Sequence, residues 1–199
     1  AILRRMRRVA GLSLMLVACG GGEGDGPPNV DAGAGAGGGG GAPPSKVAFV
    51  SSTEYTPDFG TAEAADALCT ERASFVGLPG SFRAWLSDAS SSPSSRFSRP
   101  LGNYVRVKGA VIAKGWVGLT TEVLKVPLDY EEFGDETLLG FTAWTGTDAD
   151  GTATSQDCST WSGKGQGTFG DIRAYDQSWT QMPSPAGCGG FGHLYCFEQ

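Results

Sequence analysis

The composition of the chain changes abruptly after Pro44, and this change limits what can fold. Residues 20–44 are nearly half glycine and hold almost no bulky apolar side chains. Such a segment cannot offset the entropy lost on ordering, so we expect a flexible tether. Residues 45–199 contain all five tryptophans and suit one domain of about 150 residues. The tether predicts that this domain is held at a distance from whatever precedes it.

A short apolar run precedes the glycine tract and closes on a cysteine. Four arginines (Arg4, Arg5, Arg7 and Arg8) lead into residues 9–17, and the sequence LVAC then ends at Cys19. The run is too short to cross a bilayer as a helix. This pattern resembles the signal of bacterial diacylglyceryl-modified lipoproteins, although a leader with a chance cysteine is the alternative. The resemblance implies a signal peptide at 1–18, with Met6 as a second candidate start, and a linker at 19–44 behind lipidated Cys19.

The lipoprotein resemblance also implies a cellular location. Gly20 is not the aspartate that, in that family, goes with inner-membrane retention, so we expect an outer-membrane lipoprotein of the cell envelope, facing the periplasm or the surface. The membrane is then a partner through the lipid anchor. The formal charge of −6 becomes about −10 once the four leader arginines are removed, which disfavours nucleic acid as a partner.

Apolar periodicity in residues 45–199 predicts one early helix among many short strands. Thr61 can cap the helix, Cys69 falls on its apolar face beside Leu68, and Gly77 can end it. Residues 87–95 are serine-rich and predict a loop. The expected strands are 47–50, 82–86, 104–107 and 111–112 as a hairpin, 141–144, and 194–197. This pattern is typical of an α+β domain.

Several blocks of the domain carry a second resemblance. AADALC at 64–69, VGLPGSFRAWLS at 76–87, WTGTDADG at 144–151, CSTW at 158–161 and LYCFE at 194–198 look, in the same order, like the endostatin domain of the multiplexin collagens. The pattern is also similar to a bacterial lipoprotein domain of unknown function. Both have the C-type-lectin-like fold, which is therefore the implied fold here.

Four cysteines remain after Cys19, and sequence alone allows three ways of pairing them. The endostatin resemblance implies a nested scheme that joins Cys69 to Cys196 and Cys158 to Cys188. The histidine-based zinc site of endostatin has no counterpart near the start of this domain, so no zinc is carried over.

Catalytic chemistry is poorly represented. His193 is the single histidine, and no serine or cysteine near it suggests a nucleophile, so we interpret it as a packing or surface residue. The C-type-lectin-like fold includes enzymes that generate formylglycine through paired active-site cysteines, and this is the enzymatic alternative. Because all four cysteines are expected to be structural, we predict that the protein is not an enzyme.

Asp148, Asp150 and Thr152 occupy alternate positions across Gly151, and spaced carboxylates in a glycine-containing loop suit calcium. Calcium is the one cofactor that the sequence suggests. The alternative is that both aspartates close Asx turns, which the surrounding turn residues favour.

Charge is segregated along the chain. Five basic residues lie between Asp88 and Glu122 with no acid among them, whereas residues 129–136 hold five acids. In endostatin the corresponding stretch binds heparin, so we interpret the basic set as a candidate site for sulfated glycans, against the alternative of a solvated face. The set is Arg96, Arg99, Arg106, Lys108 and Lys114.

The tryptophans complete the sequence-based expectations. Trp144 and Trp161 match endostatin-like blocks and are expected in the core, whereas Trp85, Trp116 and Trp179 could fill the core or form a sugar-stacking surface. Taken together, the sequence predicts a lipid-anchored, non-catalytic binding or structural domain. Its expected partner is an extracellular polysaccharide or an envelope protein, and carbohydrate binding assisted by calcium is the runner-up.

Overall fold

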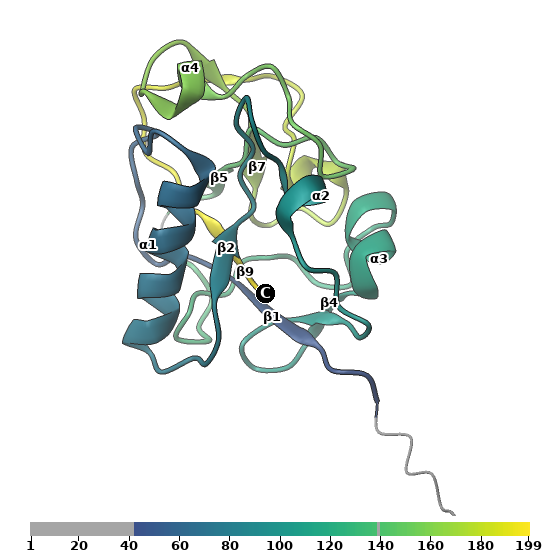
Figure 1. The fold of residues 1–199 in the computed structure, drawn as a ribbon. Helices are drawn as coiled ribbons and strands as arrows, with labels where there is room; N and C mark the ends of the chain where they lie inside the picture. Colours follow the sequence, from purple (N-terminus) through teal and green to yellow (C-terminus); the bar gives the residue numbers. More distant parts are fainter. Residues whose placement is uncertain (1–41, 139) are drawn as a thin grey trace, which may run out of the picture. The chain divides into compact units, whose positions relative to one another are not determined.

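The computed structural model describes residues 42–138 and 140–199 (Figure 1). The predicted signal peptide, Cys19 and the linker as far as residue 41 lie outside the described residues. Residues 42–45 are exposed and have no regular structure, and the described residues belong to one compact unit. Within the described part, none of the helices has the length and apolar character needed to span a bilayer.

The main sheet has five strands in the order β2-β9-β1-β3-β4. The first and last strands of the domain, β1 and β9, lie side by side at its centre and run antiparallel, with Phe49 opposite Cys196. β3 is parallel to β1, and β4 closes the expected hairpin against β3. The bounds are β1 (Lys46–Val50), β2 (Phe82–Ala84), β3 (Tyr104–Val105), β4 (Val111–Ala113) and β9 (Tyr195–Glu198).

Two further sheets have two strands each. β5 (Thr142–Trp144) pairs antiparallel with β7 (Phe169–Asp171), and β6 (Gln166–Gly167) pairs antiparallel with β8 (Ala186–Gly187). Together with the helices, these small antiparallel sheets confirm the α+β class predicted from the sequence.

The expected early helix is α1 (Ala62–Phe75), and its start is fixed by two side chains. Thr61 Oγ1 accepts a hydrogen bond from Ala64 N at 3.2 Å, and the Asp88 carboxylate accepts one from Ala62 N at 2.9 Å. Burial alone would raise the pKa of Asp88, but hydrogen bonds from Ala62 and from Ser90 lower it to about 2. The serine-rich loop is thereby joined to the helix N-terminus.

The other helical segments were not predicted. The expected loop at 87–95 contains the beginning of α2 (Pro93–Arg96), because proline is favoured in the first turn of a helix and Ser92 with Ser95 forms a capping box. α3 (Gly115–Thr121) contains two glycines and a threonine pair, residues with low helix propensity. The remaining segments are α4 (Cys158–Trp161) and the 3₁₀ turn η1 (Gln177–Trp179).

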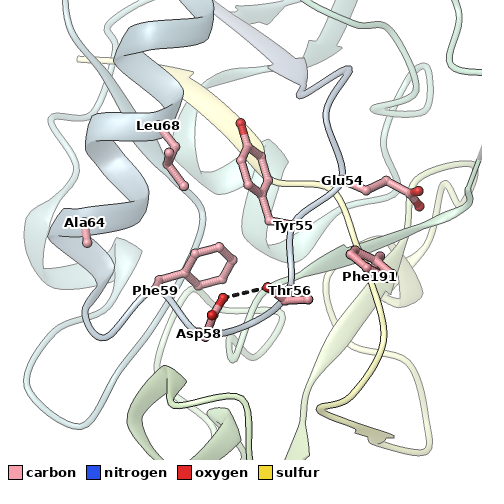
Figure 2. Close-up of a pocket in the computed structure, with 8 residues that line it drawn as sticks. All are labelled: Glu54, Tyr55, Thr56, Asp58, Phe59, Ala64, Leu68 and Phe191. Atoms are coloured by element: carbon pink, nitrogen blue, oxygen red, sulfur yellow. Dashed lines mark hydrogen bonds between the residues drawn. The ribbon is translucent and has the colours of Figure 1, made fainter.

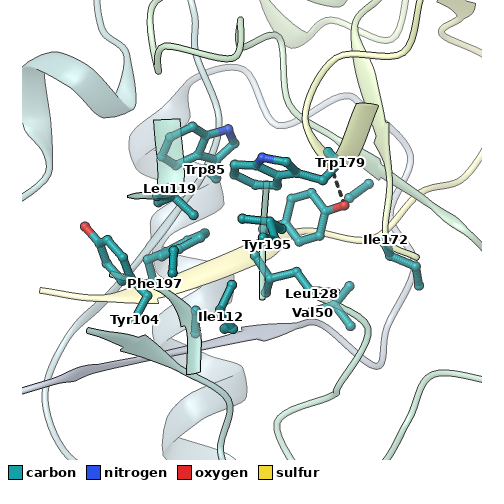
Figure 3. Packing of buried hydrophobic residues seen from close by; sticks show 14 of the residues in the cluster. Val50, Trp85, Tyr104, Ile112, Leu119, Leu128, Ile172, Trp179, Tyr195 and Phe197 are labelled. Carbon is teal, nitrogen blue, oxygen red and sulfur yellow. Dashed lines mark hydrogen bonds between the residues drawn. The ribbon is translucent and has the colours of Figure 1, made fainter. Parts of the chain in front are cut away.

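Trp85 is the centre of the larger core cluster (Figure 3). Its ring lies 5.0 Å from that of Trp179, 5.5 Å from Phe197 and 5.7 Å from Phe97, and its Nε1 donates to Thr180 Oγ1 at 2.7 Å. Two of the three tryptophans left open by the sequence, Trp85 and Trp179, are therefore core residues. Such rings supply large apolar areas that a domain with many glycines needs for stability.

A second cluster lies between α1, β2 and the two-stranded sheets. Trp144 and Trp161 belong to it, with ring centroids 6.4 Å apart, which confirms their predicted place in the core. Trp116 is partly buried against the first cluster, 5.6 Å from Trp85.

Both disulfides have the nested pairing implied by the endostatin resemblance. Cys69 is bonded to Cys196, which joins the buried face of α1 to β9, and Cys158 is bonded to Cys188. All four cysteines are buried within the second cluster. The first bond closes nearly the whole domain, with 127 residues of sequence separation, and the second closes a local loop of 30.

The segment α4 is left-handed. Cys158, Ser159, Thr160 and Trp161 all have φ between 52° and 56°, and none is glycine. Left-handed backbone costs about 1–2 kcal/mol for each L-residue, so surrounding contacts must hold the turn. Asp157 Oδ1 accepts from Thr160 N at 2.9 Å, while the Cys158 disulfide and the fully buried Trp161 ring fix both ends.

Removing the two disulfides separately should lower the free energy of unfolding by different amounts, because the two bonds close loops of different length. Replacing Cys69 and Cys196 together by alanine should cost about 5 kcal/mol of unfolding free energy, and replacing Cys158 and Cys188 about 3.5 kcal/mol, in the chain-entropy model. Urea unfolding followed by tryptophan fluorescence measures both values. A larger loss from the second pair would contradict the expectation that loop closure dominates.

Candidate functional site

A half-open groove of about 430 Å³ lies beside the first half of α1 (Figure 2). One wall is the segment that follows β1, a second is the helix itself, and Phe191 approaches from the loop before β9. The lining residues are Glu54, Tyr55, Thr56, Asp58, Phe59, Ala64, Leu68 and Phe191. The groove therefore combines aromatic surface with two carboxylates.

Main-chain pairing positions the Tyr55 side of the groove. Tyr55 N donates to Gly192 O at 2.8 Å, and Gly192 N donates back to Tyr55 O at 3.0 Å. The Trp144 Nε1 donates to the same Tyr55 carbonyl at 3.2 Å. A Cβ at Gly192 would lie 2.9 Å from Trp144 Nε1, so the close approach of backbone and ring requires glycine there. The Tyr55–Gly192 pairing therefore fixes the backbone next to Phe191.

The floor of the groove rests on the second core cluster. The Phe59 ring lies 5.6 Å from Trp161 and 6.3 Å from Tyr55, and Gly60 N donates to Trp161 O at 2.8 Å. Tyr55 is half-buried, and this burial raises the pKa of its phenol. Phe191, by contrast, is 65% exposed. The groove has a fixed aromatic floor and one exposed aromatic edge.

The two carboxylates lie on the rim. Thr56 Oγ1 donates to Asp58 Oδ1 at 2.7 Å, which leaves the second oxygen of this exposed side chain directed to solvent or ligand. The Glu54 side chain is 39% exposed. Both can accept hydrogen bonds from hydroxyl or ammonium groups.

An acidic hollow of about 270 Å³ shares Glu54 with the groove. Its other lining residues are Ser52, Glu131, Asp135, Glu136, Leu138 and His193. Burial, and next the charge of Glu132, raise the pKa of Glu131. This hollow makes the electrostatic potential next to the groove negative.

His193 lies at the base of the hollow and is 1% exposed. Its Nδ1 is 2.7 Å from Ser51 O, and because a carbonyl can only accept, Nδ1 is the donor. The Nε2 is 3.9 Å from Glu54 Oε1. Of the two places considered from the sequence, packing or surface, the first is correct.

A buried ion pair fixes the segment between β1 and the groove. The Glu132 side chain is fully buried and accepts from Ser52 N at 2.9 Å, Ser52 Oγ at 2.6 Å and Arg72 Nε at 2.7 Å. Arg72 lies on α1, so this network links the helix, the segment after β1 and the acidic stretch at 129–136.

Three of the five predicted basic residues are used within the domain. Arg96 donates to the Asp66 carboxylate and to main-chain carbonyls of β2 and the segment that follows, and its side chain is 9% exposed. Arg106 pairs with Asp129 and lies 4.0 Å from the Tyr130 ring, and Lys108 pairs with Asp135 at 2.9 Å. Two of the five basic residues thus pair with two of the five acids at 129–136.

The two other members, Arg99 and Lys114, are exposed. The Arg99 guanidinium lies 4.8 Å from the centre of the Trp116 ring, and Lys114 is the residue before α3. In the described part of the chain, Arg99 and Lys114 are therefore the two members of the set with no carboxylate oxygen within 4.0 Å.

The candidate calcium ligands form turns. Asp148 Oδ1 accepts from Ala149 N at 2.7 Å, and Asp150 Oδ1 accepts from Thr152 N at 2.8 Å and from Thr152 Oγ1 at 2.6 Å. Asp150 therefore forms an Asx turn, whereas the Asp148 carboxylate accepts from the adjacent residue. Across residues 42–138 and 140–199, no group of three or more His, Cys, Asp and Glu side chains is arranged to hold a metal ion.

Neither a scan against protein-family models nor a search of curated proteins finds a match to this chain.

The groove beside α1 was not predicted from the sequence. Its one signal is the segment Thr53-Glu-Tyr-Thr-Pro-Asp-Phe59, where aromatic and acidic residues alternate just after a strand, a place where loops carry functional side chains.

Breaking the buried ion pair should destabilise the domain strongly. Replacing Arg72 by methionine keeps the apolar stem but leaves the Glu132 carboxylate buried without its cation, which should cost about 3 kcal/mol. Lys108→Met is the matched control, because its pair with Asp135 is exposed and should be worth less than about 1 kcal/mol. Thermal or urea unfolding would compare the two, and equal losses would contradict the prediction.

Proposed function

We propose that the protein is a lipid-anchored, non-catalytic binding domain of the cell envelope, and that it binds neutral or amino-sugar polysaccharide in the groove beside α1. The observation that carries this proposal is the groove itself. The groove has an aromatic floor at Tyr55 and Phe59 and an exposed aromatic edge at Phe191. Its rim carries the carboxylates of Glu54 and Asp58.

The lining suits sugars for two physical reasons. A pyranose ring has an apolar C–H face that packs on aromatic side chains, as Phe191 and Tyr55 would allow. Its hydroxyl groups, or the ammonium of an amino sugar, donate to carboxylate oxygens such as those of Asp58 and Glu54. A volume of about 430 Å³ lies within the usual range for a small-ligand pocket.

Electrostatics argue against sulfated polymers at this site. Glu54 and Asp58 lie on the rim, and the acidic hollow adjoins the groove. Bringing a sulfate close to these carboxylates costs Coulomb energy, whereas a neutral or cationic sugar avoids the cost. The basic residues first considered for heparin lie elsewhere, and three of the five already pair with carboxylates.

We further propose the C-type-lectin-like fold for the domain. The features that support it are the central pairing of the first and last strands, the early helix joined to the last strand by Cys69–Cys196, and the second disulfide in the loop region. These features accompany the endostatin-like sequence blocks in matching order.

Binding without catalysis is supported by the state of the reactive residues. The four cysteines are bonded and buried, which leaves no thiol pair of the kind that the formylglycine-generating chemistry requires among the described residues. His193 donates Nδ1–H to a main-chain carbonyl from beneath the surface.

Removing the aromatic edge or a rim carboxylate should weaken sugar binding. Phe191→Ala should lower affinity about tenfold, because one aromatic contact with a ligand is worth about 1–1.5 kcal/mol, and Asp58→Asn should act similarly on amino sugars alone. A glycan array with neutral, amino and sulfated sugars selects the probe, and calorimetry then measures affinity.

Tyr175→Ala is the matched control, since Tyr175 is 50% exposed and lies outside the groove. Binding that Phe191→Ala leaves unchanged would reject the groove. Selective binding of sulfated sugars would reject the ligand class.

The anchor is tested separately. Cells grown with a radiolabelled fatty acid should incorporate label into the wild-type chain, and the Cys19→Ala chain should lack it and leave the membrane fraction, because one thiol carries the attachment. Label that persists in Cys19→Ala would place the lipid elsewhere. A wild-type chain without label would reject the anchor.

A further inference from the structure

Cations without a carboxylate partner gather in one region of the domain. Of the eleven lysine and arginine side chains in the described residues, six lie within 4.0 Å of a carboxylate oxygen. The five others are Lys46, Arg99, Lys114, Lys164 and Arg173. Lys46, Arg99 and Lys114 lie around the point where the chain enters the domain.

Contacts at Gly102 define this point. Gly102 N donates to Pro44 O at 3.2 Å, and a Cβ on Gly102 would lie 2.5 Å from the carbonyl oxygens of Pro43 and Pro44. A Cβ on Gly115, the first residue of α3, would lie 3.6 Å from Gly102 O. The entering chain, the loop before β3 and the start of α3 are therefore in contact. Figure 1 shows β1 running outward on the side where β4 and α3 lie.

Two of the three cations around this point make contacts within the domain. Lys46 Nζ donates to Ser98 O at 3.0 Å, and the Arg99 guanidinium lies 4.8 Å from the centre of the Trp116 ring. The Trp116 ring in turn packs 5.6 Å from Trp85 in the core. These contacts hold the Lys46 and Arg99 charges against the domain, and Lys114 is exposed at the start of α3.

Two exposed apolar side chains lie among these cations. Leu101 is 87% exposed, the largest value among the exposed apolar side chains of the described part, and it is two residues from Arg99. Val117 is 63% exposed and lies in the first turn of α3, three residues after Lys114, which precedes the helix. We call Lys46, Arg99, Leu101, Lys114 and Val117 the tether face.

We propose that the tether face rests on an anionic phospholipid surface, with Arg99 and Lys114 at the headgroups and Leu101 and Val117 at the interface. This inference depends on the proposed lipid anchor, because the anchor brings the membrane within reach. Clusters of basic and exposed apolar residues are what interfacial binding to anionic lipid uses.

The charge distribution favours this orientation. The acidic stretch at 129–136 and the acidic hollow beside the groove would be repelled by an anionic surface, whereas the tether face would be attracted. A tether of the length and composition expected from the sequence would give an effective concentration on the order of millimolar, so a weak surface affinity is sufficient. Each basic residue near such a surface multiplies the bound population by about fivefold.

The experiment places a photoreactive benzoyl-phenylalanine at position 101 or at position 191 in the full acylated chain. Both positions are highly exposed, but Phe191 adjoins the Tyr55–Gly192 pair beyond the other end of β1 from Lys46. The protein is reconstituted into phosphatidylethanolamine vesicles with about one quarter phosphatidylglycerol, irradiated and digested. Mass spectrometry then counts lipid adducts.

We expect at least about a fivefold larger lipid adduct yield at 101 than at 191. The double change Arg99→Glu and Lys114→Glu should lower the yield at 101 to that at 191, while Lys164→Glu, which removes a cation elsewhere, should leave it unchanged. Replacing phosphatidylglycerol by phosphatidylcholine should act like the double change, because the headgroup charge is lost.

Equal yields at 101 and 191, or a yield at 101 that is insensitive to headgroup charge, would overturn the proposal. Failure of the anchor is distinguishable, because the protein would then not stay with the vesicles at all. In that case flotation of the Cys19→Ser chain with the same vesicles tests the face alone, and no difference from its Arg99→Glu, Lys114→Glu form rejects it. Retention on heparin without lipid adducts would reassign the face to a sulfated polymer.

Discussion

The bond between Cys69 and Cys196 is the constraint on which the rest of the fold depends. It attaches the buried side of α1 to β9, and β9 lies between β1 and β2 in the main sheet. Because α1 also forms one wall of the groove and carries Arg72, the position of the groove follows from the same attachment. The disulfide, the strand pairing and the Arg72–Glu132 ion pair all hold one helix against one sheet edge. A domain with short strands and many glycines has few other ways to fix a helix.

Ion pairs formed in the fold change how the charged stretches of the sequence are interpreted. The basic stretch before residue 122 and the acidic stretch at 129–136 look like two opposite patches in the sequence, yet Arg106 meets Asp129 and Lys108 meets Asp135. Once these pairs are formed, two smaller charged regions remain. A negative region surrounds Glu54 and the acidic hollow, and a positive region lies where the chain enters the domain. The two proposed contacts, sugar at the groove and lipid at the tether face, lie at opposite ends of β1 and can be occupied together.

Local signals were sufficient for much of the fold. The Thr61 cap, the β3–β4 hairpin and the strands at both ends of the domain follow from capping, turn chemistry and apolar periodicity. The core positions of Trp144 and Trp161 were implied by the endostatin resemblance. The short helices were missed because α3 has poor intrinsic propensity and is held by packing of Leu119 in the core. The groove was missed because it joins residues 54–59 to Phe191, a contact across most of the chain that only the β1–β9 pairing creates.

The left-handed turn at Cys158–Trp161 has a consequence for anyone who redesigns the domain. At Ser159 and Thr160, which are exposed, the ordinary ranking of residues is inverted. Glycine and asparagine, poor choices in a right-handed helix, fit a positive φ with least cost, whereas valine or isoleucine would be strained by the backbone conformation itself. Residue preferences at positions 159 and 160 would therefore reflect the left-handed backbone and carry no information about binding.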